Sequence, residues 1–479
     1  MAIKSKYDVV IIGAGVSGLI CGAYLAKYGR KVLIVEKNHN PGGCCVSFMR
    51  NGFRFDAGAH IIGGCGVTGV MTRILRNLNI DQVFVKITPT DRFFFDGDVI
   101  EISDTVKEYI ATLKKLFPKE KKIGDFFEKI LTFSKRIQDI VSYESDITYQ
   151  QLLDNYFEDK KIKAILSGQS GFLGISPSRA SEKAMAAMMI SYLVGGAYYP
   201  LGGASSISDK LAANFSSRGG DLLLRTSAKK LVIKNGNVTE LLIEKDGELV
   251  SVKSDFFVSS IDAHMTMYNI IGREHIANDA IESINRSNPS QSLFALYLGT
   301  SLQKDVVDKN VGWHYRDYDV NDGLKDCYYI SAPSLYDSKA APDNKTTLEV
   351  FRMIDQMSGE HGKAKTDRLS YQKQTVSFLK TLFPSIESEI LVKETAMPST
   401  IEKYTGSYLG AAYGWGMECD QYRRNDIIDK NLFRNLFHTG QWTNPGGGIL
   451  AVAISGYFIA KKVLAGNESA RMASLEGKI

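Results

Sequence analysis

The stretch Tyr7–Gly18, which reads YDVVIIGAGVSG, decides the fold of this chain. Its first six residues form a largely apolar run, as expected for a buried strand of a parallel sheet. Glycines follow at the spacing GxGxxG, and Ser17–Tyr28 is predicted to form a helix. Gly13 permits a tight turn, Gly15 lets a phosphate approach the backbone, and Gly18 lets the helix pack closely on the sheet. The pattern predicts a dinucleotide-binding unit whose helix N-terminus offers N–H groups to a pyrophosphate.

An acidic residue follows at the position that such a unit requires. Lys31–Val35 is predicted to be the next strand, and Glu36 ends it, 18 residues after Gly18. A carboxylate at this place accepts hydrogen bonds from a ribose. It also repels a ribose 2′-phosphate, so the motif alone permits NAD or FAD and disfavours NADP.

Two further glycine-rich segments favour FAD over NAD. The first comprises Asn40–Cys45 (NPGGCC) and Gly52–His60 (GFRFDAGAH), and it offers a backbone cradle for a cofactor longer than NAD. The second comprises Thr439–Gln441 (TGQ) and Pro445–Gly448, and it opens an apolar helix predicted to end near Leu464. A helix N-terminus at the flavin's pyrimidine edge would stabilise negative charge on the reduced ring. Alone, this second segment is also compatible with an ordinary helix start, but together the three elements predict FAD.

Strand–helix alternation at both ends of the chain surrounds a different middle. Residues 105–194 have a helical, Lys-rich character, and Ser176-Pro177 is predicted to cap a helix. Residues 221–259 are predicted to form short strands that turn at Asn235-Gly236 and Asp246-Gly247. The expected fold is α/β, with a discontinuous Rossmann-like FAD-binding domain, a mixed-sheet substrate domain and a helical lid. The expected boundaries are 1–75, 201–265 and 431–479 for the FAD-binding domain, 76–200 for substrate domain and lid, and 266–430 for the mixed sheet.

Composition limits the other classes of function. The net charge of +5 is too weak to indicate nucleic-acid binding. The six cysteines lack metal-ligand spacing, so we expect neither a metal site nor disulfides, and we expect a reducing, cytoplasmic compartment. The longest uncharged run, Ala184–Ser208, is broken by glycines and Pro200 and is not expected to span a membrane.

With these motifs in hand, the chain resembles the phytoene desaturase, carotenoid isomerase and retinol saturase family of FAD oxidoreductases, nearly end to end. GGCC at Gly42–Cys45 and TGQ at Thr439–Gln441 are most similar to retinol saturase, whereas AVAISGY at Ala451–Tyr457 is similar to carotenoid isomerases. The resemblance is also carried by GAGVSG, Tyr199–Ser205, Val258–His264, Thr405–Ser407 and Gly410–Gly414. It implies a redox enzyme that desaturates, saturates or isomerises an apolar polyene or isoprenoid substrate.

Carried over residue by residue, the resemblance also implies the contacts to FAD. They are Gly13, Ala14, Gly15, Val16, Ser17 and Gly18 for the pyrophosphate; Glu36, with Lys37 beside it, for the ribose; Ala228 for the adenine; Gly43, Cys44, Gly58, Ala59 and His60 for the isoalloxazine; and Gly440, Gln441, Gly447, Gly448, Ile449 and Leu450 for the pyrophosphate and pyrimidine edge.

Several side chains have both a functional and a structural interpretation. His60 is a candidate to touch the flavin or shuttle a proton, or it is a turn histidine with a satisfied hydrogen bond. The thiols of Cys44-Cys45 are expected to pack on the cofactor rather than to act as a redox pair. Tyr404, Tyr413 and Trp415 either line an apolar substrate tunnel or belong to the core.

Two basic clusters, Lys114–Lys122 and Lys160–Lys163, are either solvated helix faces or a surface that docks on anionic lipid. Leu116, Phe117, Ile162 and Ile165 would supply the apolar side chains of such a surface. We therefore expect peripheral membrane contact, an apolar small-molecule substrate and no nucleic acid, and leave the electron partner open. The alternatives are an amine-oxidase-like flavoprotein acting on a more polar substrate and a non-catalytic, FAD-stabilised membrane-associated protein.

Overall fold

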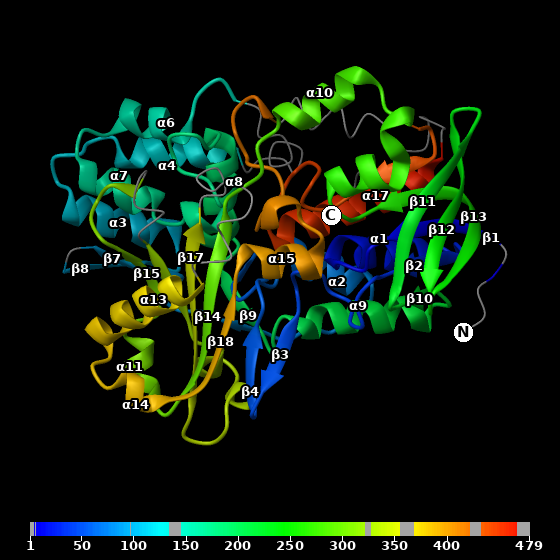
Figure 1. The fold of residues 1–479 in the computed structure, drawn as a ribbon. Helices are drawn as coiled ribbons and strands as arrows, with labels where there is room; N and C mark the ends of the chain where they lie inside the picture. Colours follow the sequence, from blue (N-terminus) through cyan, green and yellow to red (C-terminus); the bar gives the residue numbers. More distant parts are fainter. Residues whose placement is uncertain are drawn as a thin grey trace.

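The fold was obtained as a computed structural model that describes residues 4, 6–95, 97–133, 145–320, 327–354, 368–421 and 433–466. Two seven-stranded sheets organise these residues, and each is covered by helices (Figure 1). The sheet that contains the N-terminal strand takes strands from both ends of the chain, whereas the other sheet is built mainly from the middle.

The first sheet is the predicted dinucleotide-binding sheet. Its central strands run parallel, and two antiparallel strands extend it beyond β13. The order is β10 (Asp221–Leu223), β2 (Val32–Val35), β1 (Lys6–Ile12), β13 (Glu248–Ser259), β12 (Asn237–Lys245) and β11 (Thr226–Lys234), with β19 (Leu436–His438) also paired to β13. The predicted turns are present: Asn235-Gly236 and Asp246-Gly247 all have positive φ, as two-residue hairpins require. The α/β fold class is confirmed, and the predicted dinucleotide-binding sheet is assembled from separate stretches of the chain.

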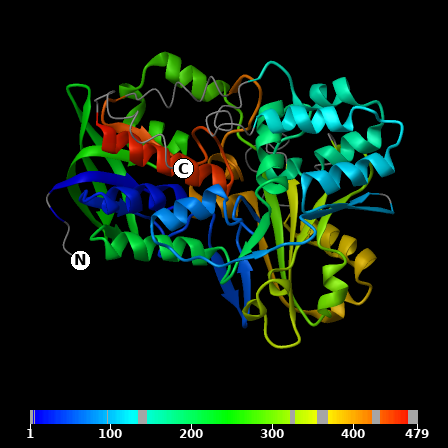
Figure 2. The same ribbon diagram turned by 180° about the vertical axis from the view of Figure 1, so that it is seen from behind.

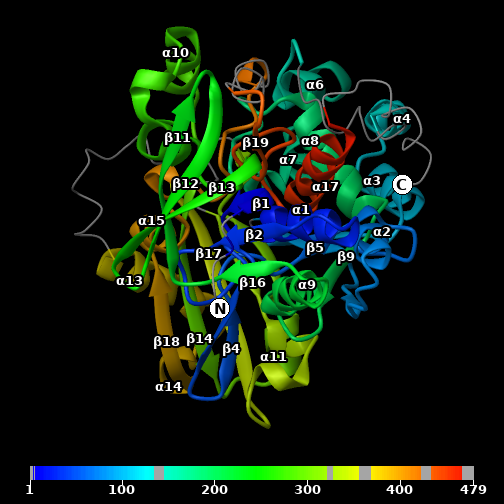
Figure 3. The same cartoon turned by 90° about the vertical axis from the view of Figure 1, so that its right-hand side faces the viewer.

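Four helices pack around this sheet: α1 (Val16–Lys27), α2 (Val70–Asn77), α9 (Ser205–Ser217) and α17 (Ile449–Ala465). Helices α1 and α17 lie side by side although 421 residues separate them in the sequence (Figures 2 and 3). A Cβ atom at Gly456 would lie 2.3 Å from the Ser17 carbonyl oxygen, so only glycine permits this close crossing. Helix α17 is thereby held directly behind the glycine turn.

The second sheet is mixed, because β15 pairs parallel to β7 and antiparallel to β16. Its order is β18 (Ile390–Ala396), β14 (Ser292–Thr300), β17 (Thr346–Ile354), β16 (Tyr328–Ser331), β15 (Gly312–Tyr315), β7 (Asp91–Phe95) and β8 (Asp98–Ile102). One face packs on α13 (Arg368–Leu382), near α11 (Lys304–Asp308) and α14 (Ile386–Glu389).

The predicted helical lid is a packed layer on this second sheet. It consists of α3 (Val106–Leu116), α4 (Ile123–Thr132), α6 (Tyr149–Tyr156), α7 (Lys160–Ser167) and α8 (Glu182–Leu193). Phe126 and Tyr109 of this layer share one hydrophobic core with Phe93 and Trp313 of the sheet. The helices are therefore part of the domain that they cover. No helix in the described part of the chain has the length and apolarity needed to cross a membrane.

Two local predictions were wrong. Ser176-Pro177 does not cap a helix, because the Ala180 N–H donates to the Ser176 carbonyl and closes a turn. Helix α8 begins instead at Glu182, where the Ser181 side chain accepts from the Lys183 N–H. The sequence Tyr198–Gly203 (YYPLGG) also predicts a loop, but its first three residues belong to strand β9, Ala197–Pro200. The remaining short elements are β3 (Ser47–Arg50), β4 (Phe53–Asp56), β5 (Ile62–Gly63), β6 (Phe84–Lys86), β9 (Ala197–Pro200), the π-helix Met265–Gly272, α10 (Asn278–Arg286) and α15 (Pro398–Thr405).

Candidate cofactor cradle and active site

The three motif glycines have different surroundings. Gly13 has φ 98°, and a Cβ there would lie 2.8 Å from Ile261 Cγ2. A Cβ at Gly18 would lie 2.3 Å from the Gly13 carbonyl oxygen. In contrast, a Cβ at Gly15 would meet no atom within 4 Å. Gly13 and Gly18 are therefore required by the turn itself, whereas Gly15 borders free space at the helix N-terminus, as an approaching pyrophosphate requires.

Glu36 is held beside this turn by backbone donors. The Ala14 N–H donates to Oε2 over 2.9 Å, and the Asn38 N–H donates to Oε1 over 2.8 Å. Each carboxylate oxygen retains a further lone pair, which fits the hydroxyls of a ribose. The Thr226 N–H donates to the Glu36 carbonyl over 2.8 Å, so Ala228 lies two residues along a strand that starts at this site.

Lys37 does not join Glu36 at the turn. Its Nζ donates to the Lys403 carbonyl over 3.1 Å, and partial burial lowers its pKa. The lysine therefore ties the chain just after β2 to the last turn of α15, while the charge of Glu36 also acts on it.

The second glycine strip lies along the first. The Gly42 N–H donates to the Ala14 carbonyl over 2.7 Å. A Cβ at Gly43 would lie 3.3 Å from Gly15 Cα, and one at Gly58 would lie 3.1 Å from the Cys44 carbonyl oxygen. Bare backbone from both strips thus forms one continuous surface. It is called the glycine cradle below, and it comprises Gly13–Gly18, Gly42, Gly43 and Gly58.

The start of α17 closes the same region. Gly448, with φ 101°, is the N-cap, and no side chain caps the helix. Its first N–H groups are therefore available to a ligand. A Cβ at Gly447 would lie 2.4 Å from the Tyr413 carbonyl oxygen, and the hydroxyls of Thr439 and Ser17 are 2.5 Å apart. The third predicted element thus meets the first.

The neighbouring residues Gly440, Gln441, Ile449 and Leu450 take part in this closure. The Gly440 N–H donates to Ser455 of α17 over 3.2 Å. Ile449 and Leu450 are partly exposed, and a Cβ at Gly64 would lie 2.9 Å from Leu450 Cδ2. The Gln441 carbonyl packs against Gly414.

Cys44 lies beside Gly58 in the second glycine strip. Its side chain is solvent-accessible, yet burial raises the pKa of its thiol to about 11. From this combination of accessibility and burial we infer that Cys44 borders an internal space, referred to below as the cavity. Tyr192 and Tyr413 combine the same two properties, and burial raises the pKa of both phenols. The proximity of Cys44 contributes to the shift at Tyr413, so the two line the same cavity.

Aromatic rings pack around His60 beside this cavity. The group is called the aromatic chamber below, and it consists of His60, Phe172, Trp313, Tyr329 and Phe351. His60 stacks on Phe351, with centroids 4.5 Å apart, and on Tyr329, with centroids 5.0 Å apart. Phe172 contacts Tyr329 at 5.4 Å between centroids, and Trp313 does so at 4.6 Å. Burial lowers the pKa of His60 to about 4, so the ring is neutral at pH 7.

Of the three tyrosine and tryptophan candidates, only Tyr413 lies at the cavity. The predicted tunnel role of Tyr404 is wrong, because its side chain is 52% exposed on the surface. That of Trp415 is also wrong: the side chain is buried in the core of the first domain, and its Nε1–H donates to the Trp442 carbonyl over 2.9 Å. The sequence did not reveal Phe172, Trp313, Tyr329 and Phe351, which come from distant segments.

The proposed lipid-docking surface is only partly supported. Ile162 and Ile165, predicted to be exposed, are buried in the helical layer, because they share the inner face of α7. Lys161 and Lys163 on that helix form ion pairs with Asp98 (3.5 Å) and Asp154 (2.7 Å). Leu116 is 47% exposed at the end of α3, where Lys114 and Lys115 are also exposed.

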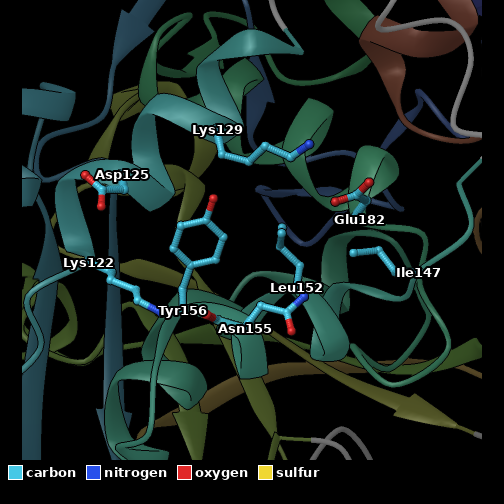
Figure 4. Close-up of a pocket in the computed structure, with 8 residues that line it drawn as sticks. All are labelled: Lys122, Asp125, Lys129, Ile147, Leu152, Asn155, Tyr156 and Glu182. Carbon is cyan, nitrogen blue, oxygen red and sulfur yellow. Dashed lines mark hydrogen bonds between the residues drawn. The ribbon is translucent and has the colours of Figure 1, made fainter.

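A second cavity, of about 530 Å³, lies in the helical layer (Figure 4). It carries charges of both signs and contains none of the residues of the glycine cradle. Its lining residues are Lys122, Asp125, Lys129, Ile147, Leu152, Asn155, Tyr156 and Glu182.

Residues 16–464 match the sequence profile of flavin containing amine oxidoreductases. The chain belongs to this family. It is 23% identical to the all-trans-retinol 13,14-reductase of Rattus norvegicus, over 92% of this chain and 83% of the relative. It is 22% identical to the chloroplastic prolycopene isomerase of Daucus carota, over 96% and 80%.

Solved structures share the fold. An oxidoreductase from Methanosarcina mazei superposes with a TM-score of 0.69 at 17% identity, covering 95% of this chain and 100% of that one. A putrescine oxidase bound to putrescine superposes with a TM-score of 0.68 at 14% identity, covering 96% and 99%. The chain is therefore an FAD-dependent oxidoreductase, and its resemblance to the retinol saturase and carotenoid isomerase group is confirmed. The non-catalytic alternative is wrong.

Proposed function

We propose that this FAD-dependent oxidoreductase acts on an apolar polyene or isoprenoid substrate, by desaturation, saturation or flavin-assisted isomerisation. Retinol and prolycopene, which the relatives' names specify, are both polyenes. We also propose that the glycine cradle, with Glu36 and the N-terminus of α17, holds the FAD.

The observation that carries this proposal is the neutrality of the cavity wall. At pH 7 the low pKa of His60, about 4, leaves its ring uncharged, and the raised pKa of Cys44, about 11, keeps its thiol protonated. The phenols of Tyr192 and Tyr413 are also kept neutral by burial. A wall of neutral rings and thiol suits a hydrocarbon and offers no counter-ion to an ammonium group.

Asp91 is a buried carboxyl group behind this wall. It accepts hydrogen bonds from Trp313 Nε1 and Gln169 Nε2, each over 3.1 Å. Burial raises its pKa to about 7. Asp91 therefore orients the indole of Trp313, and its oxygens are already engaged by the protein.

Bound FAD supplies the exchange of a hydride equivalent with the substrate. The protein's part is to hold the cofactor and the substrate and to shield them from water. Uncapped backbone N–H groups at the start of α17 would stabilise negative charge on a cofactor held there. The aromatic chamber would surround the polyene and exclude water, so placement of the substrate would contribute more than a charged acid or base.

The second candidate function is oxidation of an amine, which the structural likeness to putrescine oxidase suggests. At 14% identity that likeness concerns the fold alone. The two candidates predict opposite substrate preferences, so one experiment separates them.

FAD-loaded enzyme is mixed anaerobically with retinol, with a carotene and with putrescine. We expect a polyene, and not putrescine, to react. The polyene should either change the long-wavelength absorbance of the flavin or be converted to an isomer by enzyme whose flavin was reduced beforehand. Chromatography of the polyene identifies the product. Reduction of the flavin by putrescine, with every polyene recovered unchanged and the flavin spectrum unaffected, would reject the proposal.

We further propose a cytoplasmic location with peripheral membrane contact, because a substrate of this class resides in the bilayer. The exposed end of α3 supports this proposal, and the buried face of α7 does not.

A further inference from the structure

Two buried polar atoms in the aromatic chamber have no hydrogen-bond partner: Nε2 of His60 and the hydroxyl of Tyr329. His60 is 8% exposed and Tyr329 is 2% exposed. Leaving a buried polar atom unpaired costs free energy, so native proteins rarely do so without a reason. Two such atoms on contacting side chains point to a ligand.

The hydrogen-bonding role of each atom is fixed. His60 Nδ1 lies 3.1 Å from the Gly58 carbonyl oxygen, and a carbonyl can only accept. Nδ1 therefore carries the proton, and Nε2 is a bare acceptor. Burial lowers the pKa of His60 to about 4, which keeps Nε2 unprotonated at neutral pH. Burial raises the pKa of Tyr329, so its phenol remains a donor.

The two rings also share one location. They stack with centroids 5.0 Å apart and an interplanar angle of 26°. Phe172 contacts both, and Phe351 covers the imidazole. The rings around them present apolar faces, so this acceptor and this donor are polar groups in an otherwise apolar surrounding. Gly58, which fixes the imidazole, also packs against Cys44 of the cradle.

We propose that His60 and Tyr329 together recognise a hydroxyl group on the substrate. A hydroxyl donates to Nε2 and accepts from the phenol at the same time. An ether or carbonyl can only accept, an ammonium can only donate, and a hydrocarbon does neither. The inference rests on the proposed function and deepens it, because it selects a polyene alcohol over a polyene hydrocarbon.

The test measures binding to oxidised, FAD-loaded enzyme by quenching of tryptophan fluorescence. The probes are retinol, its methyl ether and the hydrocarbon in which a methyl group replaces the alcohol carbon. We expect affinity to fall about tenfold from alcohol to ether and about tenfold again to hydrocarbon, as expected for one hydrogen bond lost at each step.

Two variants show which residue causes each of the two expected losses of affinity. Tyr329→Phe removes only the hydroxyl and should weaken binding of alcohol and ether about tenfold while leaving the hydrocarbon unchanged. His60→Phe keeps an aromatic ring and should abolish the preference for alcohol over ether. The control is Tyr315→Phe on the neighbouring strand, whose hydroxyl already donates to the Gly168 carbonyl over 2.6 Å. It should preserve the ranking of the three probes.

Equal affinity of wild type for the three probes, or an unchanged ranking in Tyr329→Phe, would overturn this inference and leave the proposed function standing. Failure of all three probes to bind would reject the proposed function and this inference with it. If His60→Phe loses FAD, the Tyr329→Phe result alone decides.

Discussion

Gly15 is the residue at which loss of cofactor can be separated from loss of fold. A side chain there would meet no protein atom within 4 Å, and the backbone φ of −68° suits any residue. We predict that Gly15→Val folds with an unchanged thermal midpoint as apoprotein but binds no FAD, because the side chain fills the path of the pyrophosphate. Flavin absorbance of the purified protein, with circular dichroism for the fold, measures both.

Gly18→Ala provides the contrast within the same turn. Its Cβ would lie 2.3 Å from the Gly13 carbonyl, so the turn or helix α1 must move. This variant should lose stability even without cofactor. A yellow Gly15→Val protein with normal FAD content would show that the pyrophosphate does not approach this glycine.

The same residues show how far sequence reasoning reached. The glycine turn, Glu36 and the hairpin turns are local, because each is set by neighbours within one strand–helix unit. The aromatic chamber is not local: it forms only when the order of the second sheet brings Trp313, Tyr329 and Phe351 beside His60. No spacing in the sequence encodes that order.

At the scale of elements, the wrong predictions have recognisable physical causes. Ile162 and Ile165 are three residues apart and therefore lie on one face of α7. That face is buried in the hydrophobic core and not exposed to solvent. Their spacing matches the period of a helix, so the sequence alone could have predicted that both side chains are buried. In contrast, nothing local distinguished Ser176-Pro177 from the true start of α8, since Ser181 is also a good cap.

Strands β4 and β17, from different parts of the chain, meet at two buried carboxyl groups. The Asp56 N–H donates to Glu349 Oε1 over 2.6 Å, and Tyr199 donates to the Asp56 carboxylate over 2.8 Å. Burial, with the nearby Asp56 charge, raises the pKa of Glu349 well above its usual value. The folded state therefore holds a proton at Glu349 that the unfolded chain releases near pH 4.

This proton makes stability depend on pH. Because the folded pKa is the higher one, the contribution of Glu349 is complete below about pH 4 and is lost as pH rises toward the folded pKa. Glu349→Gln keeps the acceptor for Asp56 and cannot ionise. We predict that its free energy of unfolding rises relative to wild type with increasing pH, by up to about 1.4 kcal/mol per pH unit. Denaturant unfolding at a series of pH values measures this, and parallel pH profiles for the two proteins would contradict it.

At the scale of the whole molecule, the cradle belongs to one sheet and the chamber mainly to the other. The cavity therefore lies at the junction of the two layers, where ligand sites are common. Figure 1 shows the helical layer of α3, α4, α6, α7 and α8 on the second sheet, away from the first. The proposed polyene substrate resides in bilayers, so we expect some outer surface of the protein to touch lipid.

The two basic clusters allow a matched test of that contact. Lys114 and Lys115 lie beside exposed Leu116 at the end of α3, whereas Lys161 and Lys163 are already paired with aspartates. Each free lysine contributes about 1 kcal/mol at an anionic surface, and a paired lysine contributes less because its field is neutralised. We predict that Lys114→Gln/Lys115→Gln weakens co-sedimentation with phosphatidylserine vesicles at low salt by roughly 30-fold in affinity, from about 2 kcal/mol. Lys161→Gln/Lys163→Gln, with the same change in net charge, should bind like wild type.

Salt provides the second arm of this experiment, because the attraction is screened over about 10 Å at moderate ionic strength. Wild type should be partly released by salt, and its FAD content should be unaffected in both double variants. Equal losses in the two variants would mean that net charge alone governs binding and that the end of α3 is not the contact. A wild type that stays in the supernatant at low salt would remove peripheral membrane contact from the proposal and require the polyene to arrive by a soluble carrier.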